Sequence, residues 1–181
     1  MNLPNSLTLA RLLLIPVFLV LVSLESLYTD AIAAAVFVLS AVTDGLDGYY
    51  ARKNKQVTLL GKFMDPLVDK LLISAALVVL VELGRLPGWI AVVIISREFA
   101  VTGLRSIAAA EGVIITASKL GKIKTVTQVI AITALFLRDY PFSLIHLPFA
   151  SIAMAVALLF TLWSGLDYFM KAWKFLKKDG Y

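Results

Sequence analysis

Six apolar segments, each close to the length of a membrane-crossing helix, account for most of this sequence. They cover approximately residues 7–25, 30–50, 63–83, 87–110, 123–138 and 147–173. A helix needs roughly 20 residues to cross about 30 Å of hydrocarbon, and each segment reaches or approaches that length. Little of the 181-residue chain remains for a separate soluble domain. We therefore expect a single all-α integral membrane domain over residues 1–181, with six transmembrane helices.

The composition supports a membrane protein and excludes thiol chemistry. Hydrophobic residues make up 60% of the chain and the mean hydropathy is +0.90, outside the range of soluble domains. The absence of cysteine rules out disulfides, zinc thiolates and a thiol nucleophile. No small-x-small cleavage site follows the first apolar segment, so we expect it to be retained as a span. Pro4, Asn5 and Thr8 are typical of a helix start and could also form a short interfacial segment.

Positive charges are distributed unevenly between the two sides of the predicted bundle. Of the 17 Lys and Arg residues, 15 lie at alternate membrane boundaries, and the two exceptions are Arg85 and Arg138. Cytoplasmic loops carry the excess of Lys and Arg in membrane proteins. The pattern thus predicts a multi-pass protein of the cell membrane, with both termini and the loops after the second and fourth spans in the cytoplasm.

Four aspartates, Asp44, Asp47, Asp65 and Asp69, fall within 26 positions between long apolar runs. Helical spacing puts the first two on one face and the last two on a face of the next helix. The two helices are antiparallel neighbours, so these faces can meet near the cytoplasmic boundary. Close, desolvated carboxylates repel each other unless cations neutralise them, and all-oxygen ligands suit Mg²⁺ or Mn²⁺. The aspartates therefore predict a divalent-metal site, with the active site facing the cytoplasm.

Two other interpretations of the aspartates remain open. They could pair with Arg52, Lys62 and Lys70 at a wet interface without any chemistry. They could also line the ion path of a divalent-cation transporter, because intramembrane acids mark such paths. Transporters usually place these acids near the midplane, whereas here they lie toward one face.

The spacing of these residues resembles the signature of the CDP-alcohol phosphotransferase family. Asp44-x-x-Asp47-Gly48-x-x-Ala51-Arg52 is followed, after eight residues, by Gly61-x-x-x-Asp65-x-x-x-Asp69, and no position departs from the pattern. The resemblance implies metal ligation by the first three aspartates. It implies that Asp69 acts as general base and also contacts a metal, and that the protein is a homodimer.

The same resemblance implies where the nucleotide lipid binds and what is transferred. Gly48, Ala51, Arg52 and Gly61 would line the CDP site, and Asn5 and Thr8 would either contact the nucleotide or cap the first helix. Two cations can neutralise a pyrophosphate while a carboxylate takes the proton from an attacking hydroxyl. CDP-diacylglycerol would remain in the lipid phase, and CMP would leave.

The acceptor alcohol is indicated by a second basic group. Arg97 and Arg105 lie in SREFAVTGLR, and Lys119, Lys122 and Lys124 lie in SKLGKIKTVTQ, at the same predicted membrane face. Such cations suit an acceptor that carries a phosphate. With the N-terminal NLPNSLTLARLLLIPVF, these stretches resemble the branch of the family that uses glycerol 3-phosphate and makes phosphatidylglycerophosphate. Two alternatives stay open: a cardiolipin synthase or another phosphatidyltransferase of the family, or cations that only set the topology.

Two further features have simpler interpretations. Asp167 and Lys171 are four residues apart and are expected to form a local ion pair. His146, the only histidine, lies between prolines in a predicted outer loop, and no catalytic role is expected for it.

Overall fold

The computed structural model describes the backbone of residues 3–53, 59–110 and 118–176, and the side chains of residues 9–43, 67, 68, 70–109 and 118–171. Within these ranges the chain forms six α-helices, a short 3₁₀ helix and no strand. The elements are α1 (Leu3–Ser23), α2 (Leu27–Lys53), α3 (Leu59–Glu82), α4 (Gly88–Ala110), α5 (Lys119–Phe136), η1 (Phe142–Ile145) and α6 (Phe149–Leu176).

The expected all-α architecture is confirmed, and every predicted apolar segment forms a helix. The boundaries differ most where polar residues continue a helix beyond its apolar part. α1 begins at Leu3, so the stretch considered for a separate interfacial segment forms the first turns of this helix. α2 continues to Lys53, and α5 begins at Lys119 rather than at 123. The position of an apolar run predicts where a helix lies, but it does not predict whether charged residues extend the helix by further turns.

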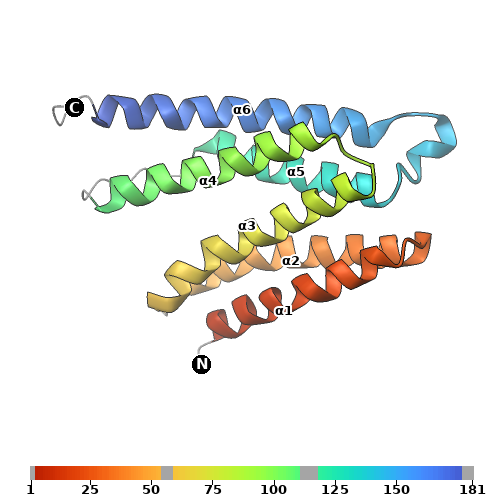
Figure 1. Cartoon of the computed structure of the whole chain (residues 1–181). Coiled ribbons are helices and arrows are strands. Elements are labelled where there is room, and N and C mark those ends of the chain that lie inside the picture. The colour runs from red at the N-terminus through yellow and green to blue at the C-terminus, as the bar shows by residue number, and fades with distance from the viewer. Residues whose placement is uncertain (1–2, 54–58, 111–117, 177–181) are drawn as a thin grey trace.

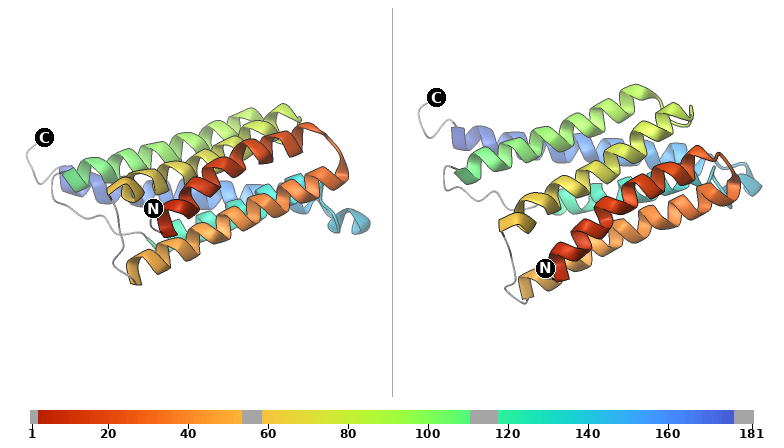
Figure 2. Two further views of the ribbon diagram at one scale, coloured as in Figure 1. Left: turned by 90° about the horizontal axis from the view of Figure 1, so that it is seen from below. Right: turned by 60° about the horizontal axis from the view of Figure 1, so that its bottom comes forward.

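The helices run alternately up and down and form two groups of three (Figure 1). α1 packs against α2 and α3, while α6 packs along α5 and against α4. Contacts of α2 with α5 and of α3 with α4 join the two groups, as the further views also show (Figure 2). The end of α2 and the start of α3 lie at one end of the bundle, here named the signature end; α4 and α6 also end there (Figure 1).

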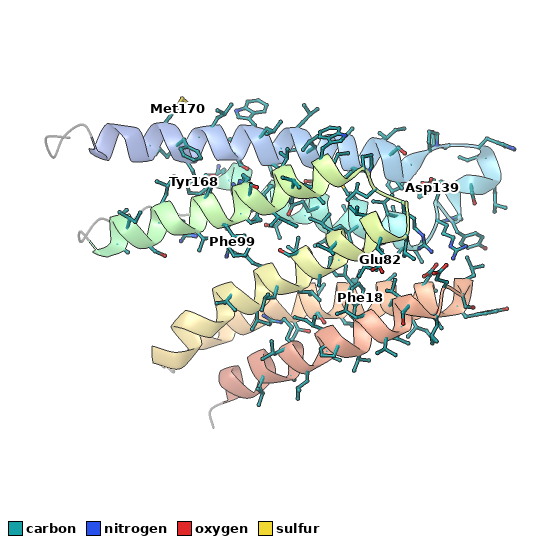
Figure 3. All side chains as sticks on the ribbon, viewed as in Figure 1. Phe18, Glu82, Phe99, Asp139, Tyr168 and Met170 are labelled. Carbon is teal, nitrogen blue, oxygen red and sulfur yellow. The ribbon has the colours of Figure 1, made fainter. Side chains whose placement is uncertain are left out.

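An apolar core fills the space between the two groups. Phe18 of α1 contacts the ring of Phe37 at 6.2 Å and meets Phe136 edge-on at 5.3 Å between ring centroids. All three rings are fully buried (Phe18 is labelled in Figure 3). α3 contributes a row of buried residues from Leu72 to Leu80, in the half of that helix away from the signature end.

Apolar side chains also cover the outside of the bundle. Large hydrophobic residues are exposed on every α-helix, among them Leu13, Leu39, Val78, Val92, Val126 and Leu159. Of the described helices, one stretch, Phe149–Lys171, is long and apolar enough to cross a membrane by length and composition. Leu9–Ser23 and Leu27–Thr43 are shorter apolar stretches, and α4 and α5 each carry three charged residues.

A buried ion cluster holds the opposite end of the bundle together. Asp30, in the first turn of α2, is fully buried, and its Oδ2 accepts from Arg85 Nη2 at 2.8 Å and from Arg138 Nε at 2.9 Å. Arg85 follows Gly84, which takes a positive φ of 67° in the tight turn after α3, a conformation that glycine adopts without strain. The cluster ties the start of α2 to the α3–α4 turn and to the end of α5.

Candidate active site at the signature end

The four aspartates of the signature lie on two helices, α2 and α3, within the turns that are at the same end of the bundle. Asp44 and Asp47 belong to the last turns of α2, and Asp65 and Asp69 to the first turns of α3 (Figure 1). Their side chains lie outside the described residues, as do those of the expected nucleotide residues Gly48, Ala51, Arg52, Gly61, Asn5 and Thr8. Among the side chains that are described, no group of three or more potential metal ligands occurs.

A cavity of about 210 Å³ opens between α3, α4, α5 and α6. The four residues expected at the acceptor phosphate all line it: Arg97, Arg105, Lys122 and Lys124. Lys70 and Ile73 of α3 form another wall, so the cavity extends to the helix that carries Asp65 and Asp69. The structure thus brings together cations from three helices, α3, α4 and α5.

Glu98 joins two of these cations inside the wall of the cavity. Its Oε1 accepts from Lys124 Nζ at 2.6 Å and from Arg97 Nη1 at 3.1 Å. Lys124 and Glu98 are buried, and the side chain of Arg97 is only 10% exposed. Buried charges are tolerated when they are paired in this way. Glu98 therefore allows two cations to sit in a part of the bundle that water reaches poorly.

Arg97 is held further by α6. Its Nη2 donates to Ser164 Oγ at 2.9 Å, and its guanidinium lies 5.7 Å from the ring centroid of Tyr168, within cation–π range. Gly165 permits this approach, because a Cβ there would stand 3.3 Å from Arg97 Cγ. Arg97 is thus oriented by three residues of α6 and by Glu98.

Tyr168 also fixes the start of α5. Its hydroxyl oxygen accepts from the backbone N–H of Ser118 at 3.0 Å, and the Ser118 side chain caps α5 by accepting from Gly121 N at 3.1 Å. In Figure 3, Tyr168 points from α6 toward α4 and α5, whereas Met170 points away from the bundle. This contact places the first turns of α5, which carry Lys122 and Lys124, against the cavity.

The cavity has a strong excess of positive charge. Among the residues that the structure describes, five cations line it, Lys70, Arg97, Arg105, Lys122 and Lys124, against one carboxylate, Glu98. Arg105 and Lys122 are exposed, so they remain reachable from solvent. A small concave site with several guanidinium and ammonium donors is suited to an anion with several oxygens, such as a phosphate.

Sequence reasoning missed Ser164 and Tyr168, and it assigned no role to Glu98. A signal for the α6 residues was present: Ser164 and Tyr168 are polar residues one turn apart in a mostly apolar helix. The predicted ion pair between Asp167 and Lys171 is confirmed, with Oδ2 and Nζ 2.7 Å apart, and neither residue lines the cavity. Lys119 is exposed and also does not line it.

The fold, the signature on α2 and α3, and the basic cavity beside them define a class of protein. The chain belongs to the CDP-alcohol phosphatidyltransferase family, whose model matches residues 1–163.

Curated relatives narrow this class. The chain is 50% identical to the CDP-diacylglycerol–glycerol-3-phosphate 3-phosphatidyltransferase of Bacillus subtilis, over 97% of both chains. It is 40% identical to the Pseudomonas fluorescens protein of the same name, over 99% of this chain and 94% of the relative. It is 42% identical to a probable phosphatidylglycerophosphate synthase of Mycobacterium tuberculosis, over 94% of this chain and 81% of the relative.

Proposed function

We propose that this chain transfers the phosphatidyl group of CDP-diacylglycerol to glycerol 3-phosphate, giving phosphatidylglycerophosphate and CMP. The observation that carries the proposal is the cavity lined by Arg97, Arg105, Lys122 and Lys124 on the helix bundle that bears the family signature. Relatives at 40–50% identity over nearly the whole chain bear the name of this reaction.

The size of the cavity favours a small phosphorylated acceptor. At about 210 Å³ it is smaller than the roughly 300–1,000 Å³ typical of pockets for drug-sized ligands. Glycerol 3-phosphate has a compact dianionic group that matches the positive excess. Phosphatidylglycerol, the acceptor of a cardiolipin synthase, carries two acyl chains and only one charge at its phosphate.

Asp44, Asp47, Asp65 and Asp69 are proposed to hold two divalent ions, Mg²⁺ or Mn²⁺. The donor set fits such ions, because these residues offer hard carboxylate oxygens and the chain contains no cysteine. When bound, the ions would neutralise the pyrophosphate of CDP-diacylglycerol and the charge that develops on the leaving phosphate oxygen.

Asp69 is proposed as the general base of the reaction. Its carboxylate would take the proton from a hydroxyl of glycerol 3-phosphate as that oxygen forms a bond to the phosphorus bearing the diacylglycerol. The bond from this phosphorus to the CMP oxygen breaks, and CMP leaves with the electron pair. Helical periodicity places position 69 one turn before Ile73, which lines the cavity, so an acceptor held there would lie near the base.

The CDP headgroup is assigned to the signature glycines and their neighbours. Gly48 and Gly61 have no side chain and Ala51 has a small one, so they would leave room for a ligand near the backbone of α2 and α3, and Arg52 would supply a cation for a phosphate. Asn5 and Thr8, in the first turns of α1, are proposed to contact the nucleotide. A bulky side chain at Gly48 would occupy this space.

All six α-helices are proposed to span the cell membrane, with the signature end in the cytoplasm. Three observations support this topology: apolar side chains on the outer faces, a membrane-length apolar stretch in α6, and the cations gathered at one end. A homodimer is part of the proposal because the resemblance to the family implies one.

An acceptor panel tests the proposal directly. Purified protein in detergent or lipid vesicles receives CDP-diacylglycerol and Mg²⁺ or Mn²⁺, and CMP release is followed with glycerol 3-phosphate, phosphatidylglycerol, serine, inositol or inositol phosphate. We expect release with glycerol 3-phosphate far above every other acceptor. A higher rate with phosphatidylglycerol would make the protein a cardiolipin synthase, and metal uptake into vesicles without CMP release would indicate a transporter.

A further inference from the structure

The cavity contains hydrogen-bond acceptors as well as cations, and their arrangement says more about the alcohol than the positive charge does. Glu98 and Thr102 stand one turn apart on α4, and Thr125 lies on α5; all three line the cavity. A phosphate dianion offers no proton to these oxygens, whereas a hydroxyl group of the ligand would.

The two threonine hydroxyls are restricted to accepting. Thr102 Oγ1 donates its proton to the backbone oxygen of Glu98 at 2.7 Å, and Thr125 Oγ1 donates to that of Gly121 at 3.2 Å. A hydroxyl has one proton and two lone pairs, so each of these oxygens can still accept but has no second proton to give. Glu98 is an acceptor in its carboxylate form, and both cations that it binds contact Oε1. The other carboxylate oxygen of Glu98, Oε2, is on the same side chain, which lines the cavity.

We infer that the α4 wall formed by Glu98 and Thr102 accepts a hydrogen bond from the hydroxyl of the acceptor that does not react. This inference rests on the proposed function. The cations would hold the phosphate of the acceptor, Glu98 and Thr102 would hold its secondary hydroxyl, and the primary hydroxyl would be left for attack. The ligand class is then a phosphorylated polyol with at least two hydroxyls, rather than any alcohol that carries a phosphate.

A pair of acceptors tests this assignment. Glycerol 3-phosphate and 3-hydroxypropyl phosphate share the phosphate and the primary hydroxyl, and only the first has the secondary hydroxyl. The measured quantity is the ratio of kcat/KM for the two acceptors on one enzyme preparation. This ratio does not depend on how much of a variant is folded, so partial misfolding cannot produce the effect.

Wild-type protein should prefer glycerol 3-phosphate by about tenfold to a hundredfold, the range for a hydrogen bond to a charged group. Thr102→Val keeps the shape of the side chain and should lower the preference by about twofold to tenfold. Glu98→Gln replaces a charged acceptor by a neutral one and should lower it by on the order of tenfold. Thr133→Val is the matched control, because Thr133 also donates to a backbone oxygen one turn earlier, that of Val129 at 2.7 Å, but lines an apolar cavity elsewhere.

The possible results separate this inference from the proposed function. Loss of preference in Thr102→Val and Glu98→Gln, with the wild-type ratio in Thr133→Val, would support the assignment. A wild-type ratio near one, or wild-type ratios in both cavity variants, would overturn it while leaving the proposed reaction intact. Absence of CMP release with both phosphorylated acceptors, together with release from another alcohol, would overturn the proposed function and this inference with it.

Discussion

Each end of the bundle contains a buried carboxylate between two cations, but the two clusters differ in what surrounds them. At the opposite end, Asp30 is fully buried and binds Arg85 and Arg138 through Oδ2. At the signature end, Glu98 binds Arg97 and Lys124 through Oε1. Both clusters therefore pair one carboxylate with two cations. They differ in the charged residues around them.

The cavity beside Asp30 is balanced in charge. It measures about 490 Å³ and is lined by two cations, Arg85 and Arg138, and two acids, Glu25 and Asp139. Arg138 also donates to the backbone oxygen of Glu25, and Asp139 accepts from the backbone N–H of Ala150. The charged groups at this end bind other groups of the protein.

The cavity beside Glu98 has cations beyond those that the carboxylate binds. Arg105 and Lys122 line it from exposed positions, in addition to the buried Arg97 and Lys124. Bringing like charges together costs free energy unless an anion joins them. The comparison favours an anion site at the signature end because of the excess of cations among the described residues around this cavity, not because of the buried ion pair, which occurs at both ends.

The largest effect is expected for the carboxylates of the signature. Asp65→Asn should lower the rate of CMP release by on the order of 10³-fold or more, because it removes a ligand charge from the proposed metal site, and bound metal ions stabilise such a transition state by several kcal/mol. Asp44→Asn and Asp47→Asn should behave alike. The rate is measured with saturating CDP-diacylglycerol and glycerol 3-phosphate.

The same substitution at the opposite end serves as the control. Asp30→Asn likewise replaces one aspartate by asparagine, here a buried one, yet it should retain turnover at a temperature where the variant is folded. Near-normal turnover in any signature variant would remove that residue from the metal site. Equal loss of turnover in Asp30→Asn would show that the two ends are not distinct in function.

For stability, in contrast to turnover, the larger loss is expected at Asp30 rather than at the signature aspartates. Asp30→Asn leaves Arg85 and Arg138 without their carboxylate, and breaking a buried ion pair costs about 3–5 kcal/mol of the free energy of unfolding. Thermal unfolding in detergent measures the loss. Glu82→Gln removes an exposed acid near the same end and should change stability little. An Asp30→Asn protein as stable as wild type would contradict a structural role for this cluster.

A smaller effect, confined to one substrate, is expected for Arg105. Arg105→Ala removes a charge-assisted contact worth roughly 1.5–3 kcal/mol, so the KM for glycerol 3-phosphate should rise about tenfold to a hundredfold. The KM for CDP-diacylglycerol should change much less, and Arg105→Lys should recover only part of the loss because an ammonium lacks the planar fork.

Arg138→Ala is the matched control for this experiment, since it removes a partly exposed arginine at the opposite end. Both KM values should stay at the wild-type level in that variant. A change in Arg105→Ala that is confined to CDP-diacylglycerol would assign this residue to the donor lipid instead of the acceptor.

The fold was more predictable than the site, and the reason is physical. Apolar runs of about 20 residues and the polar breaks between them specify where helices occur, and every such segment is a helix. The sequence also placed Arg97 and Arg105 at the same predicted membrane face, and both line the cavity. Local sequence predicts these features because each of them belongs to a single helix.

Contacts between helices were not predictable in the same way. Periodicity states which residues share a face, but not which helix that face meets. The bond from Ser118 to Tyr168 joins residues 50 apart, and that from Arg138 to Asp30 joins residues 108 apart. Positive-inside arguments correctly set Arg85 and Arg138 apart from the other cations, but they did not predict that both bind Asp30.

The smallest effect should come from an ion pair that lies near the signature end but outside the cavity. Asp167 and Lys171 are one turn apart on α6, and the lysine side chain is 50% exposed. Helical pairs of this kind contribute about 0.3–0.5 kcal/mol, because water screens the charges and two side chains lose freedom. Asp167→Asn should therefore lower the free energy of unfolding by no more than about 0.5 kcal/mol. The KM values for glycerol 3-phosphate and for CDP-diacylglycerol should both match wild type. Asp167 is adjacent to Tyr168 in sequence, but only Tyr168 lines the cavity. This variant therefore tests whether a residue of α6 must line the cavity to affect acceptor binding. A rise in the KM for glycerol 3-phosphate comparable to that of Arg105→Ala would mean that the acceptor site extends along α6 beyond the residues lining the cavity.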